Sequence, residues 1–195
     1  MRHSRREEKK QRERHQRAKK SAVQAVFGWA FQIIVVILFA YVIVFFFGQS
    51  RTNVGQSMDT TLSGGDVVLL NELSYRFKGP KRNDVISFKP NGSESSHSYI
   101  KRVIGLPGET IQIKDGMIYI NDSVYLEDTN YPQMEDAGIA QDPITLGTDE
   151  YFVLGDNRNN SEDSRFADIG NVELEDIEGK VWVVISPKEH IGLVK

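Results

Sequence analysis

The sequence predicts a mainly β protein, in which an N-terminal transmembrane helix precedes an antiparallel β domain with a small inserted β or loop excursion. Three observations favour this fold class. One long apolar run lies near the N-terminus, short β-branched and aromatic runs bounded by turn residues fill the remainder, and no helical periodicity is sustained beyond Gly48. The chain of 195 residues has room for one domain after the apolar run.

Charge divides the chain into parts of opposite sign. Residues 1–20 contain ten basic residues and three glutamates, a net charge of +7, and residues 21–50 contain no charged residue. Since the whole chain carries −3, residues 51–195 carry −10. A basic arm can bind nucleic acid, but basic residues beside an apolar run mark the cytoplasmic side of a membrane. We therefore expect a basic cytoplasmic arm over residues 1–21 and no nucleic-acid partner.

The apolar run predicts a membrane anchor. Residues 22–47 are interrupted only by Gln24, Gly28 and Gln32, and about 20 apolar residues span a bilayer. The run is too long for the apolar core of a cleavable signal peptide, which has about 7–15 residues, and no small-x-small cleavage site follows it. The sequence thus predicts a single-pass protein of the cell membrane in contact with lipid, with its N-terminus in the cytoplasm and residues 48–195 outside. The absence of cysteine fits an exported domain without disulfides.

The exported part reads as short strands separated by turns. Asp115-Gly116 between two alternating runs is a strong signal for a two-residue hairpin. The polar segment 123–149 has weak periodicity and predicts a long loop or a small excursion, so about 106–150 is expected to form a small subdomain. A short turn is expected at Glu173–Ile177. The strands are expected at 65–70, 84–88, 110–114, 117–121, 151–154 and 181–185, with a further strand around Lys101.

Lys101 and Ser57 are the first candidates for chemistry. Strand alternation places Lys101 on the same face as Tyr99 and Val103, and burial on an apolar face lowers the pKa of a lysine. Lysine can then replace histidine as the general base for a serine nucleophile. Two plainer interpretations stay open: a lysine that reaches solvent from a half-buried strand, and a serine that only caps a turn after Gly55.

A polar segment directly follows the strand expected at 151–154. Residues 155–165 are dense in hydrogen-bonding side chains and predict either a solvated loop or a packed polar network. The segment has no metal-ligand spacing, and the four histidines of the chain are scattered. A zinc site and a Ser-His triad are therefore not expected, and neither a metal nor an organic cofactor is predicted.

Four motifs in order resemble those of bacterial type I signal peptidase (leader peptidase), a membrane-bound serine–lysine protease, in its single-anchor Gram-positive-like form. They are Gly55-Gln56-Ser57-Met58, Gly65-Asp66-Val67-Val68, Lys101–Gly108 and Gly155–Arg165. The resemblance implies an antiparallel β catalytic domain of the signal peptidase type. It also implies an endopeptidase that removes N-terminal signal peptides from exported preproteins, near the secretion translocon, by cutting after a small-x-small motif such as Ala-x-Ala.

The resemblance also implies roles for particular residues. Ser57 attacks the scissile carbonyl, uncharged Lys101 takes its proton, and the Ser57 backbone N–H serves the oxyanion hole. Ser161 is expected to hydrogen-bond the Lys101 amine. The other supporting residues are expected to form an ion pair (Asp163 and Arg165), to brace the loop (Asp156 and Arg158), to belong to the nucleophile motif (Met58) and to face the lysine (Tyr99).

One position departs from the family pattern, which has proline where this chain has Thr60. If the turn geometry persists, Thr60→Pro should be tolerated and should stabilise the protein by about 0.4–1 kcal/mol. If the loop has been rebuilt around threonine, the change should destabilise it. Tolerance is the expectation.

Other classes of protein remain as alternatives. A non-catalytic homologue acting in surface-protein or pilus assembly is disfavoured by the intact Ser57, Lys101 and Ser161. A serine–lysine protease of another role, such as a self-cleaving repressor, is disfavoured by the anchor. A purely structural cell-surface protein gives no reason for the 155–165 segment.

Overall fold

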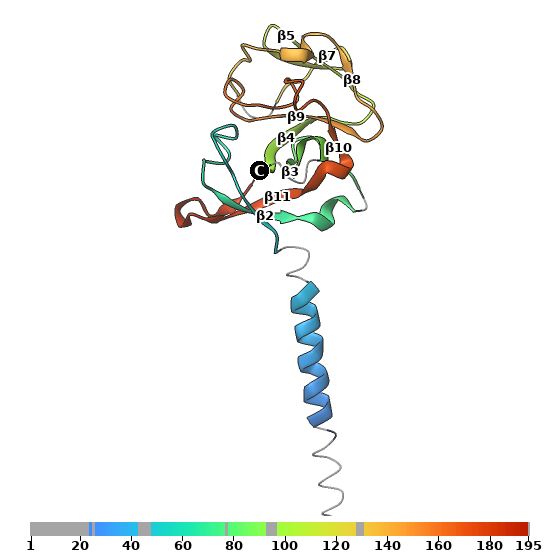
Figure 1. Ribbon diagram of the computed structural model, residues 1–195, viewed down its shortest axis with the longest axis vertical. Helices are drawn as coiled ribbons and strands as arrows, with labels where there is room; N and C mark the ends of the chain where they lie inside the picture. Colours follow the sequence, from blue (N-terminus) through green and yellow to red (C-terminus); the bar gives the residue numbers. More distant parts are fainter. Residues whose placement is uncertain are drawn as a thin grey trace, which may run out of the picture. The chain divides into compact units, whose positions relative to one another are not determined.

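The computed structural model describes residues 24, 26–42, 48–76, 78–92, 97–127 and 131–194. The basic arm expected at 1–21 lies outside these residues, as do parts of the expected anchor. The chain divides into two units, one helical and one built of β-strands (Figure 1).

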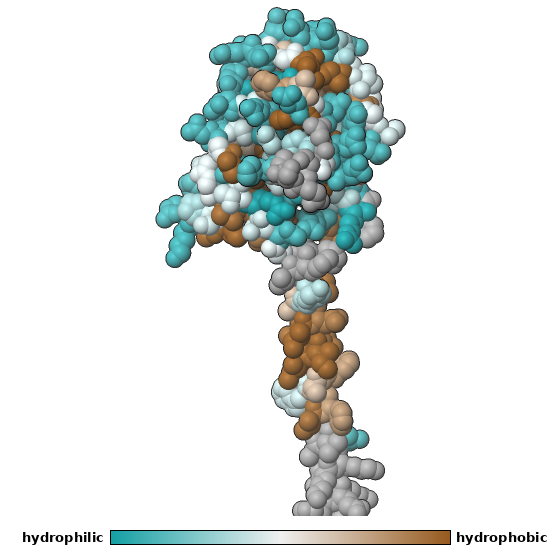
Figure 2. All heavy atoms as spheres, in the orientation of Figure 1, coloured by the Kyte–Doolittle hydropathy of each residue, from teal (hydrophilic) through white to brown (hydrophobic). Residues whose placement is uncertain are grey.

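The helical unit contains a helix over residues 26–42. Its side chains are exposed, including the aromatic rings of Phe27, Trp29 and Phe31, and Figure 2 shows a largely apolar helix surface. In the described part of the chain, no helix has both the length and the apolar character that crossing a membrane requires.

The larger sheet of the β unit has eight strands, and every pair in it is antiparallel. The order is β1-β2-β11-β3-β4-β9-β10, with β12 paired to β11. The prediction of a mainly antiparallel β domain is confirmed. The strands are β1 (Ser50–Thr52), β2 (Val67–Asn71), β3 (Val85–Phe88), β4 (Tyr99–Gly105), β9 (Glu150–Leu154), β10 (Val172–Glu173), β11 (Ile177–Ser186) and β12 (Gly192–Leu193).

The expected strands all coincide with observed ones, because β-branched and aromatic runs between turn residues fit a pleated, half-buried surface. The turn expected near Glu173–Ile177 is the 3-10 helix η4 (Leu174–Asp176). The two- and three-residue strands β1, β10 and β12 were not predicted, because so short a pairing leaves little pattern in the sequence. The remaining 3-10 helices are η1 (Glu72–Tyr75), η2 (Pro90–Gly92), η3 (Gly138–Gln141) and η5 (Lys188–His190).

A second sheet of four strands lies between β4 and β9 in the sequence, in the order β7-β6-β5-β8. Asp115 and Gly116 have φ values of +50° and +71°, as a two-residue hairpin turn with two left-handed positions requires. Lys114 pairs with Met117 across this turn, so the predicted hairpin is confirmed. The strands are β5 (Thr110–Lys114), β6 (Met117–Ile120), β7 (Ser123–Val124) and β8 (Ile144–Thr145).

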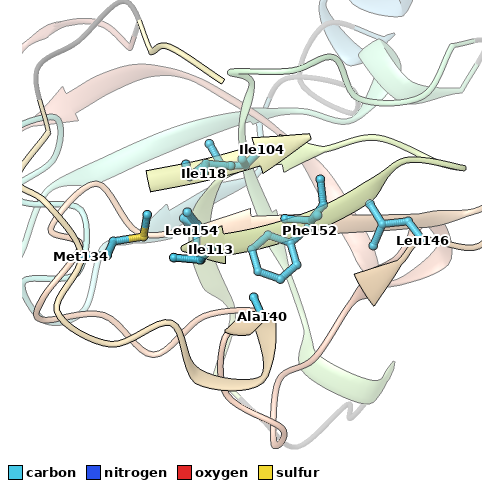
Figure 3. Close-up of a cluster of buried hydrophobic side chains, with 9 residues drawn as sticks. Ile104, Ile113, Ile118, Met134, Ala140, Leu146, Phe152 and Leu154 are labelled. Atoms are coloured by element: carbon cyan, nitrogen blue, oxygen red, sulfur yellow. The ribbon is translucent and has the colours of Figure 1, made fainter. Parts of the chain in front are cut away.

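The largest buried cluster joins the second sheet to β4 and β9. Its side chains include Ile113 and Ile118 from the second sheet and Phe152 and Leu154 from β9 (Figure 3). Two further clusters lie beneath β2 and β11 and around β3 and β9. As a result β4 is covered on both faces, and its residues from Ile100 to Gly105 are all buried.

Candidate active site

Ser57 and Lys101 meet at the surface of the larger sheet. Lys101 lies on β4, an interior strand of that sheet, with 3% of its surface exposed, and its Nζ is 2.8 Å from the Ser57 Oγ. The two residues are 44 positions apart in the sequence. The burial of Lys101 excludes the interpretation of a side chain that reaches solvent.

A cleft of about 640 Å³ opens above this pair. Tyr99, Ser161, Arg158 and Arg165 also line it, so the cleft gathers six of the nine residues singled out from the sequence. Within the described residues, no group of three or more His, Cys, Asp or Glu side chains is placed to hold a metal ion.

Burial lowers the pKa of Lys101 from 10.5 to about 8, against the opposing charges of Asp163, Glu162 and Asp156, which raise it. Desolvation disfavours the charged ammonium, and here it outweighs three carboxylates. The amine also lies 5.3 Å from the centre of the Tyr99 ring. At neutral pH roughly one tenth of the Lys101 side chains are uncharged, and the uncharged fraction reaches about one half at pH 8.

The loop that carries Ser57 is held in place by a buried side chain and by hydrogen bonds. Met58 is fully buried in the cluster under β2 and β11. Asn157 holds the same loop from the side: its backbone N–H donates to the Ser57 carbonyl at 3.0 Å, and its Nδ2 donates to the Gln56 carbonyl at 3.1 Å. Sequence reasoning missed Asn157, which lies in the 155–165 segment but carries no charge to single it out.

Gly155 allows the end of β9 to pass this loop. A Cβ at Gly155 would lie 2.1 Å from the Ser161 Oγ and 2.5 Å from the Ser57 carbonyl oxygen. Real Cβ atoms do not approach other atoms so closely, so glycine is needed here for packing. The 155–165 segment is therefore a packed network against the nucleophile loop, and the interpretation as a solvated loop is wrong.

Asp163 organises one half of this network. Its fully buried carboxylate accepts hydrogen bonds from the Gly155 N–H at 3.0 Å, the Ser161 hydroxyl at 2.8 Å and two guanidinium nitrogens of Arg165 at 2.8 and 2.9 Å. The expected pair of Asp163 and Arg165 is present. The Ser161 hydroxyl donates to Asp163, because a carboxylate two residues away is a strong acceptor. The expected hydrogen bond between Ser161 and the Lys101 amine stays a prediction.

Asp156 and Arg158 each bind a different partner. Asp156 accepts two hydrogen bonds from Arg102, at 2.8 and 2.7 Å. Arg158 pairs with Glu127 at 2.5 Å, and its guanidinium lies 4.2 Å from the centre of the Tyr131 ring. Both arginines are buried. Sequence reasoning missed Arg102 and Glu127, although an arginine in the middle of an apolar strand signals a buried acidic partner.

Thr60 corrects one expectation from the sequence. Its φ is +92°, in the left-handed region that β-branched residues rarely adopt. Proline fixes φ near −65° and cannot take this conformation. The expected tolerance of Thr60→Pro is therefore wrong: the loop is built around a residue with positive φ.

Thr60→Pro should destabilise the protein by more than about 1 kcal/mol, whereas Thr60→Gly should range from neutral to about 1 kcal/mol more stable because it removes the strain. Thr60→Ala is the matched control, since it truncates the same exposed side chain and keeps the strain. Urea unfolding of the three variants measures the differences. A Thr60→Pro protein as stable as the unchanged one would contradict the backbone geometry.

A serine hydroxyl beside a buried lysine of lowered pKa, within a cleft, has the geometry of a hydrolase that uses lysine as its general base. Comparison with known proteins gives the family. The family model described as "Signal peptidase, peptidase S26" matches residues 26–186. The chain therefore belongs to the signal peptidase family, and it is a serine endopeptidase of that class. The resemblance drawn from the four motifs is confirmed.

Individual relatives agree with the family model. The chain is 35% identical over 187 residues to a signal peptidase I of Bacillus amyloliquefaciens, covering 92% of this chain and 98% of the relative. It is 34% identical over 178 residues to signal peptidase I P of Bacillus subtilis subsp. natto, covering 88% and 94%. A crystal structure of a signal peptidase I from Enterococcus faecalis V583 is 35% identical over 53% of this chain and 97% of that chain, with a TM-score of 0.41.

Proposed function

We propose that this chain removes N-terminal signal peptides from exported preproteins, with Ser57 as nucleophile and neutral Lys101 as general base. The observation that carries the proposal is the 2.8 Å contact between the Ser57 Oγ and the Nζ of a buried lysine. A lysine with a pKa of about 8 is matched to proton transfer near neutral pH.

The reaction runs in two halves. The Ser57 Oγ attacks the scissile carbonyl carbon while its proton passes to Lys101, and the tetrahedral intermediate collapses when Lys101 returns that proton to the leaving amine. Water then attacks the acyl ester, with Lys101 again accepting a proton, and the Ser57 Oγ leaves with one. The backbone N–H of Ser57 donates to the developing oxyanion. Asp163, which raises the pKa of Lys101, stabilises the ammonium that forms midway.

The substrate class follows from the proposed activity. The cleft is lined by the loop residues Asn53 to Gln56 and by Ser98 to Ile100 at the start of β4, and an extended peptide can pair with a strand edge. We propose that small side chains occupy the positions nearest the scissile bond, in a small-x-small motif such as Ala-x-Ala.

Cleavage of a preprotein tests the proposal. Purified protein incubated with a preprotein that carries Ala-x-Ala should give one new N-terminus, immediately after the second alanine. The matched substrate replaces that alanine by leucine and should resist cleavage. Cutting at another bond, or equal cutting of both substrates, would contradict the proposed specificity.

The proposed location completes the assignment. Residues 1–21 would be a cytoplasmic arm, 22–47 a membrane anchor in contact with lipid, and 48–195 an extracytoplasmic peptidase domain near the secretion translocon. The uncharged stretch 21–50 and the exposed apolar side chains of the helix over 26–42 (Figure 2) support an anchor, since a helix that is apolar on all sides requires an apolar environment.

External protease added to intact protoplasts should degrade the β domain and spare an N-terminal tag, because the +7 arm should remain inside. Immunoblots against the tag and against the β domain measure the two outcomes. Protoplasts lysed with detergent are the control, in which the tag should also be lost. Loss of the tag from intact protoplasts while the β domain survives would refute this orientation.

A further inference from the structure

We infer that Thr61 is a positioning residue that locks the nucleophile loop to the strand carrying the general base, by way of Asp156 and Arg102. The inference rests on the proposed roles of Ser57 and Lys101. It adds a second connection between these two residues, behind their direct contact.

The connection begins on the far face of β4. Successive residues of a strand point to opposite faces, so Lys101 faces the cleft and Arg102 faces away from it. The Arg102 guanidinium donates to both carboxylate oxygens of Asp156, at 2.8 and 2.7 Å. Arg102 is 4% exposed and Asp156 is fully buried. An arginine–carboxylate pair with two parallel hydrogen bonds fixes orientation as well as distance, so Asp156 is held rigidly relative to the strand of the base.

Thr61 binds the same carboxylate from the loop. Its Oγ1 donates to an Asp156 oxygen at 2.5 Å and lies 3.3 Å from an Arg102 nitrogen. Its backbone N–H donates to the Met58 carbonyl at 3.0 Å, which closes the turn from Met58 to Thr61, directly after Ser57. Because only this one turn separates the two residues, a displacement of Thr61 should also displace Ser57.

Two features of the loop make this connection necessary. Thr60, within this turn, is strained at a φ of +92°, and a strained residue persists only where its surroundings hold it. In addition, the Ser57 Oγ becomes part of an ester in the acyl-enzyme, so its hydrogen bond with Lys101 changes during each turnover. The hydrogen bond from Thr61 to Asp156 involves no reacting atom, so it holds the loop in the same position relative to β4 throughout the reaction.

Removal of the Thr61 hydroxyl should alter the position of Ser57 without unfolding the protein and without changing the charges around Lys101. Asp156 keeps both hydrogen bonds from Arg102, so no buried carboxylate is left unpaired. The charge of Asp156 is unchanged, so the base titrates as before. Thr61→Val should therefore fold and should keep the pH profile of the unchanged enzyme, while Ser57 sits less accurately against Lys101.

Steady-state kinetics of the full-length protein on a preprotein test the inference. Thr61→Val should lower kcat by about 10- to 100-fold, with KM within about twofold and the midpoint of the pH–rate profile unchanged. Thr61→Ser, which restores the hydroxyl, should regain most of the activity. Thr145→Val is the control, because it removes an exposed hydroxyl contact with Thr110 at 3.0 Å in the second sheet, and it should have no effect.

A Thr61→Val enzyme with the kcat of the unchanged protein, or a Thr61→Ser enzyme as impaired as Thr61→Val, would overturn the inference. If Thr61→Val does not fold, Thr61→Ala is compared with Thr61→Ser by the same criteria. Failure of the proposed function is distinguishable, since it appears as activity in Ser57→Ala. With Ser57→Ala inactive and Thr61→Val normal, only the positioning role fails.

Discussion

Replacement of Ser57 by alanine should abolish turnover, and replacement of Lys101 by alanine should do the same. The Ser57 Oγ and the Lys101 Nζ are 2.8 Å apart, and in the proposed mechanism one proton passes between them, so neither residue should support turnover without the other. We expect a loss of about 10⁴-fold or more in kcat for either variant, and a double variant hardly worse than each single one. Processing of a preprotein at equal protein concentrations measures all three.

Two controls separate this effect from misfolding. Lys101→Met keeps the volume of the buried side chain without its amine, so it should fold and remain inactive. Lys114→Ala removes a lysine that also lies over an aromatic ring, 5.4 Å from the centre of Tyr119, but it is exposed in the second sheet, and this variant should be fully active. Measurable processing by folded Ser57→Ala or Lys101→Met would refute the assigned pair.

The second large effect concerns pH. Because burial lowers the pKa of Lys101 to about 8, the uncharged base becomes available as pH rises through that value. The rate constant kcat/KM should therefore increase about tenfold per pH unit below 8 and level off above it. Lys101→Arg should be inactive throughout, because guanidinium does not lose its proton in this range. A rate increase centred near pH 10.5 would contradict this explanation.

The opposing charges give an internal control for that profile. Glu162 is exposed, and its carboxylate raises the pKa of Lys101. Glu162→Gln removes the charge with little change of shape, so the rise of kcat/KM should move to lower pH. A move to higher pH, or no move at low ionic strength, would show that the lysine does not sense this carboxylate.

Local patterns in the sequence were sufficient for much of the fold. Alternation and turn residues located the long strands and the hairpin at Asp115-Gly116, because the signal for each lies within about ten residues. The same alternation placed Lys101 on a buried face. The shortest strands escaped prediction, since their pairing depends on neighbours brought close by the rest of the sheet.

The partners within the site were harder to predict because they are set by long-range packing. Asp156 and Arg158 lie two residues apart and invite the idea of a shared role. The structure instead gives Asp156 to Arg102, 54 positions away, and Arg158 to Glu127, 31 positions away. The conformation of Thr60 was likewise hidden, because threonine carries no signal for positive φ as glycine does.

The central claim is that Lys101 is uncharged when Ser57 attacks, and a titration of the Lys101 amine tests it most directly. Full-length protein in detergent micelles, labelled with ¹³C at the lysine ε-carbons, would be followed by NMR from pH 6 to 11, with the Lys101 signal assigned by its loss in Lys101→Arg. A midpoint near pH 8 is the predicted result. A midpoint at the ordinary value of 10.5 would contradict the claim, because the amine would then be almost entirely charged wherever the enzyme works.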